Sequence, residues 1–302
     1  MRIKRVVVAG GGTLGSQIAY QTAFKGFTVT IYDINATAIA AARERVTTWD
    51  QAYVRDLQAT PAAIDATHER LSYSTDLAAA VADADLVIEA VPEVVAIKRS
   101  LYEQLAQVAP SKTIFTTNTS SFLPSQFAEV TGRPQKFLAL HFVNHVWKNN
   151  MAEIMGHAGT DPEVYATIVD FAKRIGMITV ELKKEQPAYV LNTLLIPFVG
   201  AALVLWTKDV ADVATIDRTW MLSTKAPIGP FGMLDVVGLR TAYNIFKDVG
   251  ATPGHADLAA AAEKMKTALL DQGKVGVETG HGFYDYPDPA FQRPGFILGQ
   301  AK

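Results

Sequence analysis

The stretch Val6-Val7-Val8-Ala9-Gly10-Gly11-Gly12-Thr13-Leu14-Gly15 decides how this chain folds. It begins inside a β-branched run, residues 3–9, which lacks polar alternation and is typical of a strand covered on both faces. The glycines follow at once, and residues 16–23 have helical character. Strand, glycine-rich turn and helix in this order predict a dinucleotide-binding unit.

The glycines of this stretch have separate physical tasks. Gly10 permits the tight turn, Gly12 lets backbone amides approach a pyrophosphate, and Gly15 allows the helix to pack closely on the strand. The amino terminus of the helix, with Thr13 and Leu14 in its first turn, then faces the phosphates with its positive dipole end. We therefore predict that these five residues bind the cofactor.

An acidic residue supports the same prediction. The next strand, residues 27–32, ends directly before Asp33. A carboxylate about twenty residues beyond the glycines accepts hydrogen bonds from the adenosine ribose and repels a 2′-phosphate. Because no arginine follows Asp33 directly, NAD is favoured over NADP. The alternative is that Asp33 only caps the helix that begins after Asn35.

Further buried strands are predicted at residues 85–91, 113–117 and 137–141. Long helices are predicted at residues 35–57 and 61–70. Ligands of open parallel sheets bind outside the carboxyl ends of the strands. We therefore expect the polar side chains that follow the strands to gather on the cofactor side of the sheet: Glu93, Asn118, Ser120, His141 and Asn144.

His141 ends one of these strands, and Glu153 follows it twelve residues later. A histidine at the carboxyl end of a strand, with a carboxylate in reach, is suited to be a general base with its orienting partner. The alternative is a structural histidine that is hydrogen-bonded in the core. His145 stands at the spacing i, i+4 from His141, but a third ligand is missing and we predict no metal site.

The second half of the chain has a different character. Beyond Lys183-Lys184-Glu185-Gln186-Pro187, which we interpret as a linker, strands nearly vanish from the prediction. Four helices are predicted there, at residues 188–208, 209–222, 231–249 and 256–272. The predicted fold is therefore α/β, with a Rossmann-type, mostly parallel sheet domain (residues 1–184) followed by an all-α helical domain (residues 185–302).

The composition of the 302 residues limits the classes of function. A net charge of −2 gives no basic excess, so neither nucleic acid nor an anionic membrane is expected as a partner. The chain has no cysteine, which excludes disulfides and thiolate chemistry and agrees with a reducing, cytoplasmic compartment. We expect no signal peptide, because a strand begins within the first few residues. The apolar run at residues 191–206 is interpreted as a buried helix or an oligomer interface rather than a membrane span.

Taken in order, these features resemble the 3-hydroxyacyl-CoA dehydrogenase family over nearly the whole chain. The NAD-binding half of the family is matched by the glycine stretch, by Asp33 and by residues 85–93 with Lys98. Its serine loop and catalytic pair are matched by Asn118-Thr119-Ser120-Ser121 and by His141-Phe142-Val143-Asn144 with Glu153. The match continues with Asn192, Gly229-Pro230-Phe231 and Gly280-His281-Gly282-Phe283-Tyr284.

The resemblance implies a role for each matched residue. His141 would be the acid/base and Glu153 its orienting partner, while Ser120 and Asn192 would contact the substrate oxygen. These roles suit the oxidation of a secondary alcohol, because a base must take the hydroxyl proton while hydride leaves the same carbon. The nicotinamide end of NAD would be contacted by four residues: Glu93, Lys98, Ser120 and Asn144.

Two departures from the family pattern bear on the substrate. Members that act on coenzyme A thioesters carry a lysine-rich stretch in the helical hairpin after the second strand, whereas no lysine occurs here between Lys25 and Lys98. A coenzyme A 3′-phosphate would need several cations. Trp147 and Trp220 stand where large aromatic groups would reshape a narrow acyl channel, and we predict that both line the substrate pocket. Core packing is the alternative for Trp220.

We therefore predict an NAD(H)-dependent oxidoreductase that interconverts the 3-hydroxy and 3-oxo groups of a small β-keto or β,δ-diketo compound. It would act as a keto or diketo ester reductase and form a homodimer through the helical domain. One alternative is an (S)-3-hydroxyacyl-CoA dehydrogenase of fatty-acid oxidation, and others are an L-gulonate 3-dehydrogenase or an inactive, crystallin-like NADH-binding protein. The complete set Ser120, His141, Glu153 and Asn192 argues against an inactive protein.

Overall fold

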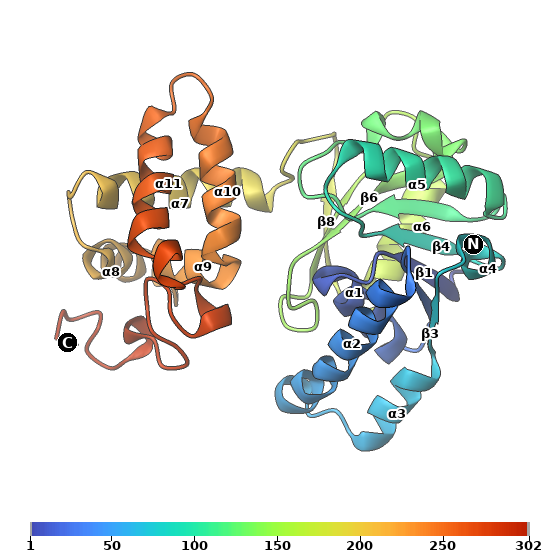
Figure 1. Ribbon diagram of the computed structural model, residues 1–302, viewed down its shortest axis with the longest axis horizontal. Coiled ribbons are helices and arrows are strands. Elements are labelled where there is room, and N and C mark those ends of the chain that lie inside the picture. Colours follow the sequence, from blue (N-terminus) through green and yellow to red (C-terminus); the bar gives the residue numbers. More distant parts are fainter. Residues whose placement is uncertain (1, 301–302) are drawn as a thin grey trace. The chain divides into compact units, whose positions relative to one another are not determined.

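The computed structural model of the protein describes residues 2–300, and the chain divides into two units between Val190 and Leu191 (Figure 1). The predicted boundary, after residue 184, comes earlier than this division. The segment between them stays with the first unit because Tyr189 is fully buried and the Val190 amide N–H donates to Glu153.

An eight-stranded sheet forms the centre of the first unit, with the strand order β3-β2-β1-β4-β5-β6-β7-β8. Neighbouring strands are parallel except β6 and β7, which run antiparallel. The predicted Rossmann-type, mostly parallel sheet is thus confirmed. The strands are β1 (Arg5–Ala9), β2 (Thr28–Tyr32), β3 (Leu71–Ser74), β4 (Leu86–Glu89), β5 (Ile114–Thr117), β6 (Phe137–Phe142), β7 (Met151–Met155) and β8 (Ile178–Leu182).

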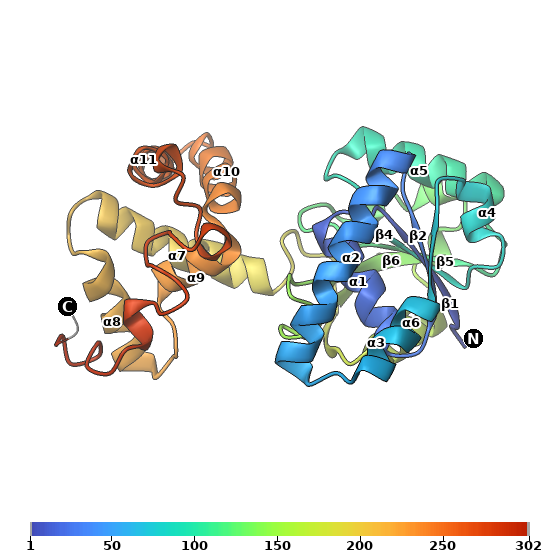
Figure 2. The ribbon, with the colours of Figure 1, turned by 60° about the horizontal axis from the view of Figure 1, so that its bottom comes forward.

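Helices cover both faces of this sheet (Figure 2). Successive residues of β1 alternate between two apolar cores: Val6 and Val8 pack with Ile18 of the first helix, and Val7 packs with Leu101 of the fifth. A strand buried on both faces needs apolar residues at every position, which is why the run lacks polar alternation. The helices are α1 (Thr13–Phe24), α2 (Ala36–Leu57), α3 (Pro61–Glu69), α4 (Leu77–Val81), α5 (Val95–Val108) and α6 (Pro162–Arg174), and the 3₁₀ turns are η1 (Pro124–Gln126), η2 (Glu129–Thr131) and η3 (Pro134–Lys136).

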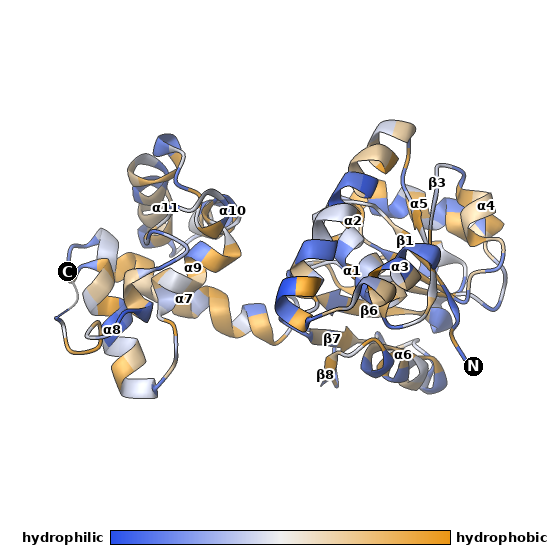
Figure 3. Ribbon diagram, turned by 90° about the horizontal axis from the view of Figure 1, so that it is seen from below, coloured by the Kyte–Doolittle hydropathy of each residue, from blue (hydrophilic) through white to orange (hydrophobic). Residues whose placement is uncertain are grey.

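The second unit is helical, as predicted. The single helix predicted at residues 231–249 is wrong, because Gly238 adopts a φ of 93° and separates two helices. Apolar residues run along most of the first helix of this unit (Figure 3), yet no helix among residues 2–300 is long and apolar enough to cross a membrane. The helices are α7 (Leu191–Thr207), α8 (Val213–Thr224), α9 (Pro230–Val237), α10 (Leu239–Gly250) and α11 (Ala256–Ala268), with the 3₁₀ turns η4 (Leu270–Gln272), η5 (Val277–Thr279) and η6 (Ala290–Gln292).

Two buried carboxyl groups hold the segments of the second unit together. Asp217 of α8 accepts hydrogen bonds from the Phe231 and Gly232 amides at the start of α9, at 2.9 and 3.1 Å. Asp235 of α9 accepts from the Phe283 and Tyr284 amides of the chain after η5, at 2.8 and 2.9 Å. Burial raises the pKa of both carboxyl groups to about 6, although these hydrogen bonds oppose the rise.

This pair predicts that the protein loses stability as pH rises. A carboxyl group whose pKa is raised by folding binds its proton more tightly in the folded state. Its contribution to stability is therefore fully present at a pH below the pKa of the unfolded state, and it is lost as the pH rises through the pKa of the folded state. We expect the free energy of unfolding to fall by on the order of 2 kcal/mol per group between about pH 4.5 and about pH 7.5. Denaturant unfolding at a series of pH values measures this slope. Asp217→Asn should show a shallower slope whatever its absolute stability, and an unchanged slope would contradict the assignment.

Candidate active site

The glycine turn forms one wall of a cavity of about 220 Å³ at the carboxyl ends of β1, β4 and β5. Gly10 has a φ of 109°, and a Cβ there would lie 2.5 Å from the Ala90 carbonyl oxygen. A Cβ on Gly15 would lie 1.9 Å from the Gly10 carbonyl oxygen, whereas one on Gly12 would meet nothing within 4 Å. Close packing therefore requires glycine at positions 10 and 15, and Gly12 keeps the cavity open.

The amino terminus of α1 opens into the same cavity. Thr13, Leu14 and Gly15 line it, and Gly12, at the N-cap, has no side chain to satisfy their amides. Uncapped amides at the positive end of a helix dipole suit an anionic group such as a pyrophosphate. The loop therefore fits the phosphates of a dinucleotide.

Asp33 lies directly after β2 and is tied to the glycine turn. Its Oδ2 accepts a hydrogen bond from the Gly11 amide at 2.8 Å, and its Oδ1 accepts from the Ile34 amide at 2.8 Å. The predicted alternative was a cap for the following helix, but Asn35 caps α2 by accepting from the Ala38 amide. Asp33 instead holds its carboxylate beside the loop, where a ribose hydroxyl could donate to it.

The opposite wall of the cavity carries Glu93, Lys98, Asn118 and Ser120. Lys98 Nζ lies 3.0 Å from Glu93 Oε2, and Glu93 Oε1 accepts hydrogen bonds from the Ser120 and Ser121 amides at 3.1 and 3.2 Å. These contacts hold the loop after β5 against the turn after β4. Burial raises the pKa of Glu93, but Lys98 and the hydroxyl groups of Thr119 and Ser121 lower it by more, so the net shift is downward.

Glu89 anchors this wall, and the sequence analysis did not identify it. Its carboxylate is fully buried at the end of β4 and lies 2.6 Å from Lys98 Nζ, which is 1% exposed. Tyr102 Oη and Thr117 Oγ1 donate to its other oxygen at 2.9 and 2.7 Å. A glutamate inside the apolar run Leu86-Val87-Ile88-Glu89 was the available signal, since a buried carboxylate requires a partner.

His141 and Glu153 face each other because β6 and β7 pair antiparallel. The register places His141 directly opposite Glu153, so both side chains project from the same face of the sheet. His141 Nδ1 lies 3.1 Å from Glu153 Oε2, and both residues are buried, with 5% and 0% of their surfaces exposed. A carboxylate on Nδ1 directs the Nε2 atom of the imidazole outward for proton transfer.

Ser120 joins the histidine to the cavity wall. Its Oγ lies 3.3 Å from His141 Nε2, while its amide is bonded to Glu93. Asn118 Oδ1 accepts from the Phe142 amide at 2.9 Å and so ties the loop after β5 to the end of β6. A substrate oxygen atom near both groups could receive a proton from His141 Nε2 and a hydrogen bond from Ser120 Oγ.

Two predicted site residues of the first unit, Asn144 and Trp147, do not line this cavity, and two others belong to the second unit. Asn144 is exposed in the loop after β6, and its carbonyl oxygen accepts from Asn149 Nδ2. Trp147 is 6% exposed, packs beside the Tyr53 ring and donates to a carboxylate of α2. That burial places its side chain in the core of the first unit. Asn192 and Trp220 belong to the second unit, in α7 and α8, where Trp220 lines an apolar cavity of about 390 Å³.

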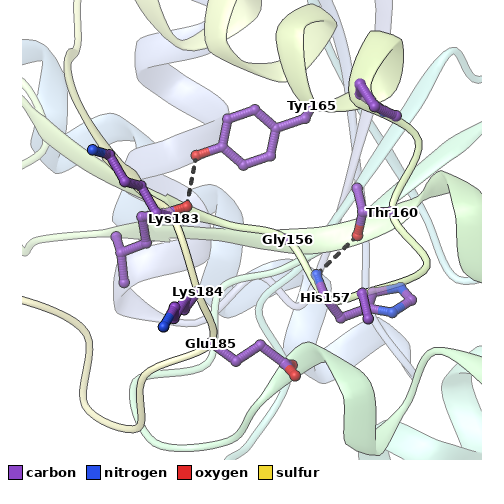
Figure 4. A pocket seen from close by; sticks show the side chains of 10 residues that line it. Gly156, His157, Thr160, Tyr165, Lys183, Lys184 and Glu185 are labelled. Atoms are coloured by element: carbon purple, nitrogen blue, oxygen red, sulfur yellow. Dashed lines mark hydrogen bonds between the residues drawn. The ribbon is translucent and has the colours of Figure 1, made fainter.

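A larger cavity of the first unit, about 550 Å³, contains none of the predicted site residues (Figure 4). His157, Tyr165, Lys183, Lys184 and Glu185 line it, and the view shows the His157 backbone bonded to Thr160. The His157 ring is engaged by the Pro134 carbonyl and the Gly159 amide, so neither ring nitrogen is available for chemistry.

Comparison with known proteins agrees with this geometry. The family model "3-hydroxyacyl-CoA dehydrogenase, NAD binding domain" matches residues 5–186, and the model of the family's C-terminal domain matches residues 189–286.

The chain belongs to the 3-hydroxyacyl-CoA dehydrogenase family.

Individual members of the family resemble it over almost their full length. A probable 3-hydroxyacyl-CoA dehydrogenase of Caenorhabditis elegans is 33% identical, covering 94% of this chain and 96% of that protein. A probable 3-hydroxybutyryl-CoA dehydrogenase of Bacillus subtilis is 32% identical, covering 95% and 99%. A solved diketoreductase, described as acting on dicarbonyl compounds, is 50% identical with a TM-score of 0.90, covering 95% and 100%.

Membership of the 3-hydroxyacyl-CoA dehydrogenase family makes the protein an NAD-dependent oxidoreductase that acts on CH–OH groups. The predicted cofactor is thereby confirmed, and so is the predicted family. The 50% identity to a diketoreductase agrees with the predicted likeness to that branch of the family.

The buried ion pair under the cofactor cavity predicts an unequal effect of two isosteric substitutions. Glu89–Lys98 and Arg5–Asp83 both have N···O distances of 2.6 Å, but only the first is buried, since Arg5 and Asp83 are 58% and 74% exposed. Glu89→Gln leaves Lys98 with less compensation and should lower the free energy of unfolding by on the order of 3 kcal/mol. Asp83→Asn should change it by less than about 1 kcal/mol. Denaturant melts of equal effect would contradict this account.

Proposed function

We propose that the protein interconverts a 3-oxo and a 3-hydroxy group on a small β-keto or β,δ-diketo ester, with NAD(H) as the hydride carrier and no coenzyme A. The observation that carries the proposal is the contact of Ser120 Oγ with His141 Nε2, 3.3 Å apart, beside the cavity that fits the dinucleotide. NAD, when bound, supplies or accepts the hydride at the carbon.

In the reductive direction, His141 gives a proton from Nε2 to the oxygen as negative charge develops on it. Ser120 donates a hydrogen bond to the same oxygen and lowers the energy of that charge. Glu153 holds the proton of Nδ1 and stabilises the charged imidazole before the transfer. In the oxidative direction, neutral His141 takes the hydroxyl proton and the same contacts serve in reverse.

The residues that we propose to hold NAD divide along its length. Asp33 would accept from the adenosine ribose, and the amides of Thr13 to Gly15 would bind the pyrophosphate. Glu93, Lys98 and Ser120 would contact the nicotinamide end, supported by their place on the opposite wall of the cavity. The roles of Asn144, Asn192, Trp147 and Trp220 in binding stay predictions from the sequence.

His141→Ala tests the proton-transfer role. The rate of NADH-dependent reduction should fall by roughly two to four orders of magnitude, the usual contribution of general acid/base catalysis. NADH affinity, measured by fluorescence titration, should change little because His141 does not line the dinucleotide cavity. His255→Ala, at an exposed turn of the second unit, is the matched control and should keep the full rate. A His141→Ala enzyme that keeps most of its rate would refute the assignment.

The surface of α2 supports a substrate without coenzyme A. Arg55 forms two hydrogen bonds with Asp56, at 2.8 and 2.9 Å, and Asp56 also accepts from the Trp147 indole. These bonds from Arg55 and Trp147 hold the pKa of Asp56 well below its usual range, so the carboxylate stays ionised and neutralises the arginine. His68 is likewise bound to Asp50, at 2.9 Å. A 3′-phosphate would have to displace these partners.

Activity on coenzyme A thioesters is the second candidate, favoured by the C. elegans and B. subtilis relatives. Under our proposal a free β,δ-diketo ester should have a kcat/KM at least about tenfold above that of acetoacetyl-CoA. Arg55→Ala should leave the KM for acetoacetyl-CoA within about twofold, as should the control Lys173→Ala on α6. A selective rise of that KM in Arg55→Ala would favour the thioester carrier.

We also propose that the protein forms a homodimer through its helical unit. Large apolar side chains on α7 and α8 are exposed, with Leu194 at 68%, Leu205 at 43% and Leu222 at 49%. Apolar surface of this kind on consecutive helices is typical of subunit interfaces.

A further inference from the structure

Two consecutive residues at the end of the first unit contact both members of the His141–Glu153 pair. The Tyr189 ring is stacked on the His141 imidazole, with ring centroids 4.6 Å apart and an interplanar angle of 25°. The Val190 amide N–H donates to Glu153 Oε1 at 2.9 Å, while Glu153 Oε2 faces His141 Nδ1. The Tyr189 ring thus covers His141, and the Val190 peptide group binds Glu153.

The backbone of this segment is held against its local preference. Ala188 and Tyr189 have φ values of 62° and 56°, in the left-handed region that residues with a Cβ rarely adopt. Two such residues in succession persist only when surrounding contacts impose the conformation. Here the imposing contacts are the full burial of Tyr189, which packs with Ala139 and Met155 of β6 and β7, and the Val190–Glu153 hydrogen bond.

From this arrangement we infer that Tyr189 is a positioning residue, which fixes the plane of the His141 imidazole and stabilises its protonated form through the face of the phenol ring. The inference rests on the proposed role of His141 as the acid. The face of an aromatic ring carries negative electrostatic potential, so a stacked imidazolium is favoured over a neutral imidazole. The stack also prevents the imidazole from rotating away from Ser120.

The hydroxyl of Tyr189 is not the group that this role requires. Burial, reinforced by the nearby carboxylates of Glu93 and Glu153, raises the pKa of Tyr189 far above its ordinary value. The phenol therefore stays protonated throughout the working range and does not compete with His141 as a proton donor. The role depends on the flat aromatic ring, so phenylalanine should be able to substitute for tyrosine at this position.

Two substitutions distinguish the effect of the aromatic ring from that of a buried apolar side chain: Tyr189→Phe keeps the ring, and Tyr189→Leu removes it. Tyr189→Phe should retain kcat and the pH profile of reduction. Tyr189→Leu should lower kcat roughly tenfold and move the alkaline midpoint of the profile to lower pH by about one unit, because the imidazolium loses its stabilising face. The affinity for NADH should stay within about twofold in both variants. A Tyr189→Leu enzyme with the wild-type rate and profile would overturn the inference.

An NMR titration of the His141 ring keeps the test independent of turnover. The midpoint should match the wild type in Tyr189→Phe and be lower in Tyr189→Leu and in Tyr189→Met, a more adaptable side chain that serves if the leucine variant does not fold. Equal midpoints in all proteins would refute the role of the ring. His141→Ala distinguishes the two levels: if that enzyme keeps its rate, the proposed function fails, whereas an inactive His141→Ala beside an unaffected Tyr189→Leu removes only the present inference.

Discussion

A carboxylate without access to water at the end of β4 constrains the arrangement of the whole site. A buried charge requires partners, and Glu89 has three: Lys98 on α5, Tyr102 one turn further along the same helix, and Thr117 on β5. Lys98 also forms an ion pair with Glu93, which accepts hydrogen bonds from the amides of Ser120 and Ser121 in the serine loop. The position of Ser120 beside His141 is therefore set by a charge that does not line the cavity.

The loop between β6 and β7 is also held in place, but by hydrogen bonds to two helices rather than by a buried charge. Its backbone turns at His145, with a φ of 60°, and the His145 amide donates to Gln17 of α1 at 2.7 Å. Further along, the Trp147 indole donates to Asp56 of α2 at 2.9 Å. The loop is thus fastened to the helix that follows the glycine turn and to the next one. The buried Trp147 therefore links the loop between β6 and β7 to α2, whatever its part in substrate binding.

Local sequence patterns were sufficient for the parts of the fold that are buried on both faces and for the glycine turn. They failed for β7, because Met151-Ala152-Glu153-Ile154-Met155 contains few strand-forming residues and takes its conformation from pairing with β6 and β8. They also failed at Gly238, where one positive φ ends a helix that an apolar period alone would continue. The spacing of His141 and Glu153 suggested a pair but not its geometry. Tyr189 carried no local signal, since its contact with His141 spans β6 and the strained segment before α7.

The antiparallel pairing of β6 with β7 has a consequence for how such an enzyme can change by insertion and deletion. Side chains alternate between the faces of a strand, so displacing β7 by a single residue would turn Glu153 away from His141 and bring an apolar neighbour, Ala152 or Ile154, into its place. The turn from residue 143 to residue 150 can consequently accept substitutions at its exposed positions, but a change in its length must not reach β7. An added residue must be absorbed as a bulge within the turn. Substitutions in this loop therefore leave the pairing of Glu153 with His141 intact, whereas a change in its length that reaches β7 breaks that pairing.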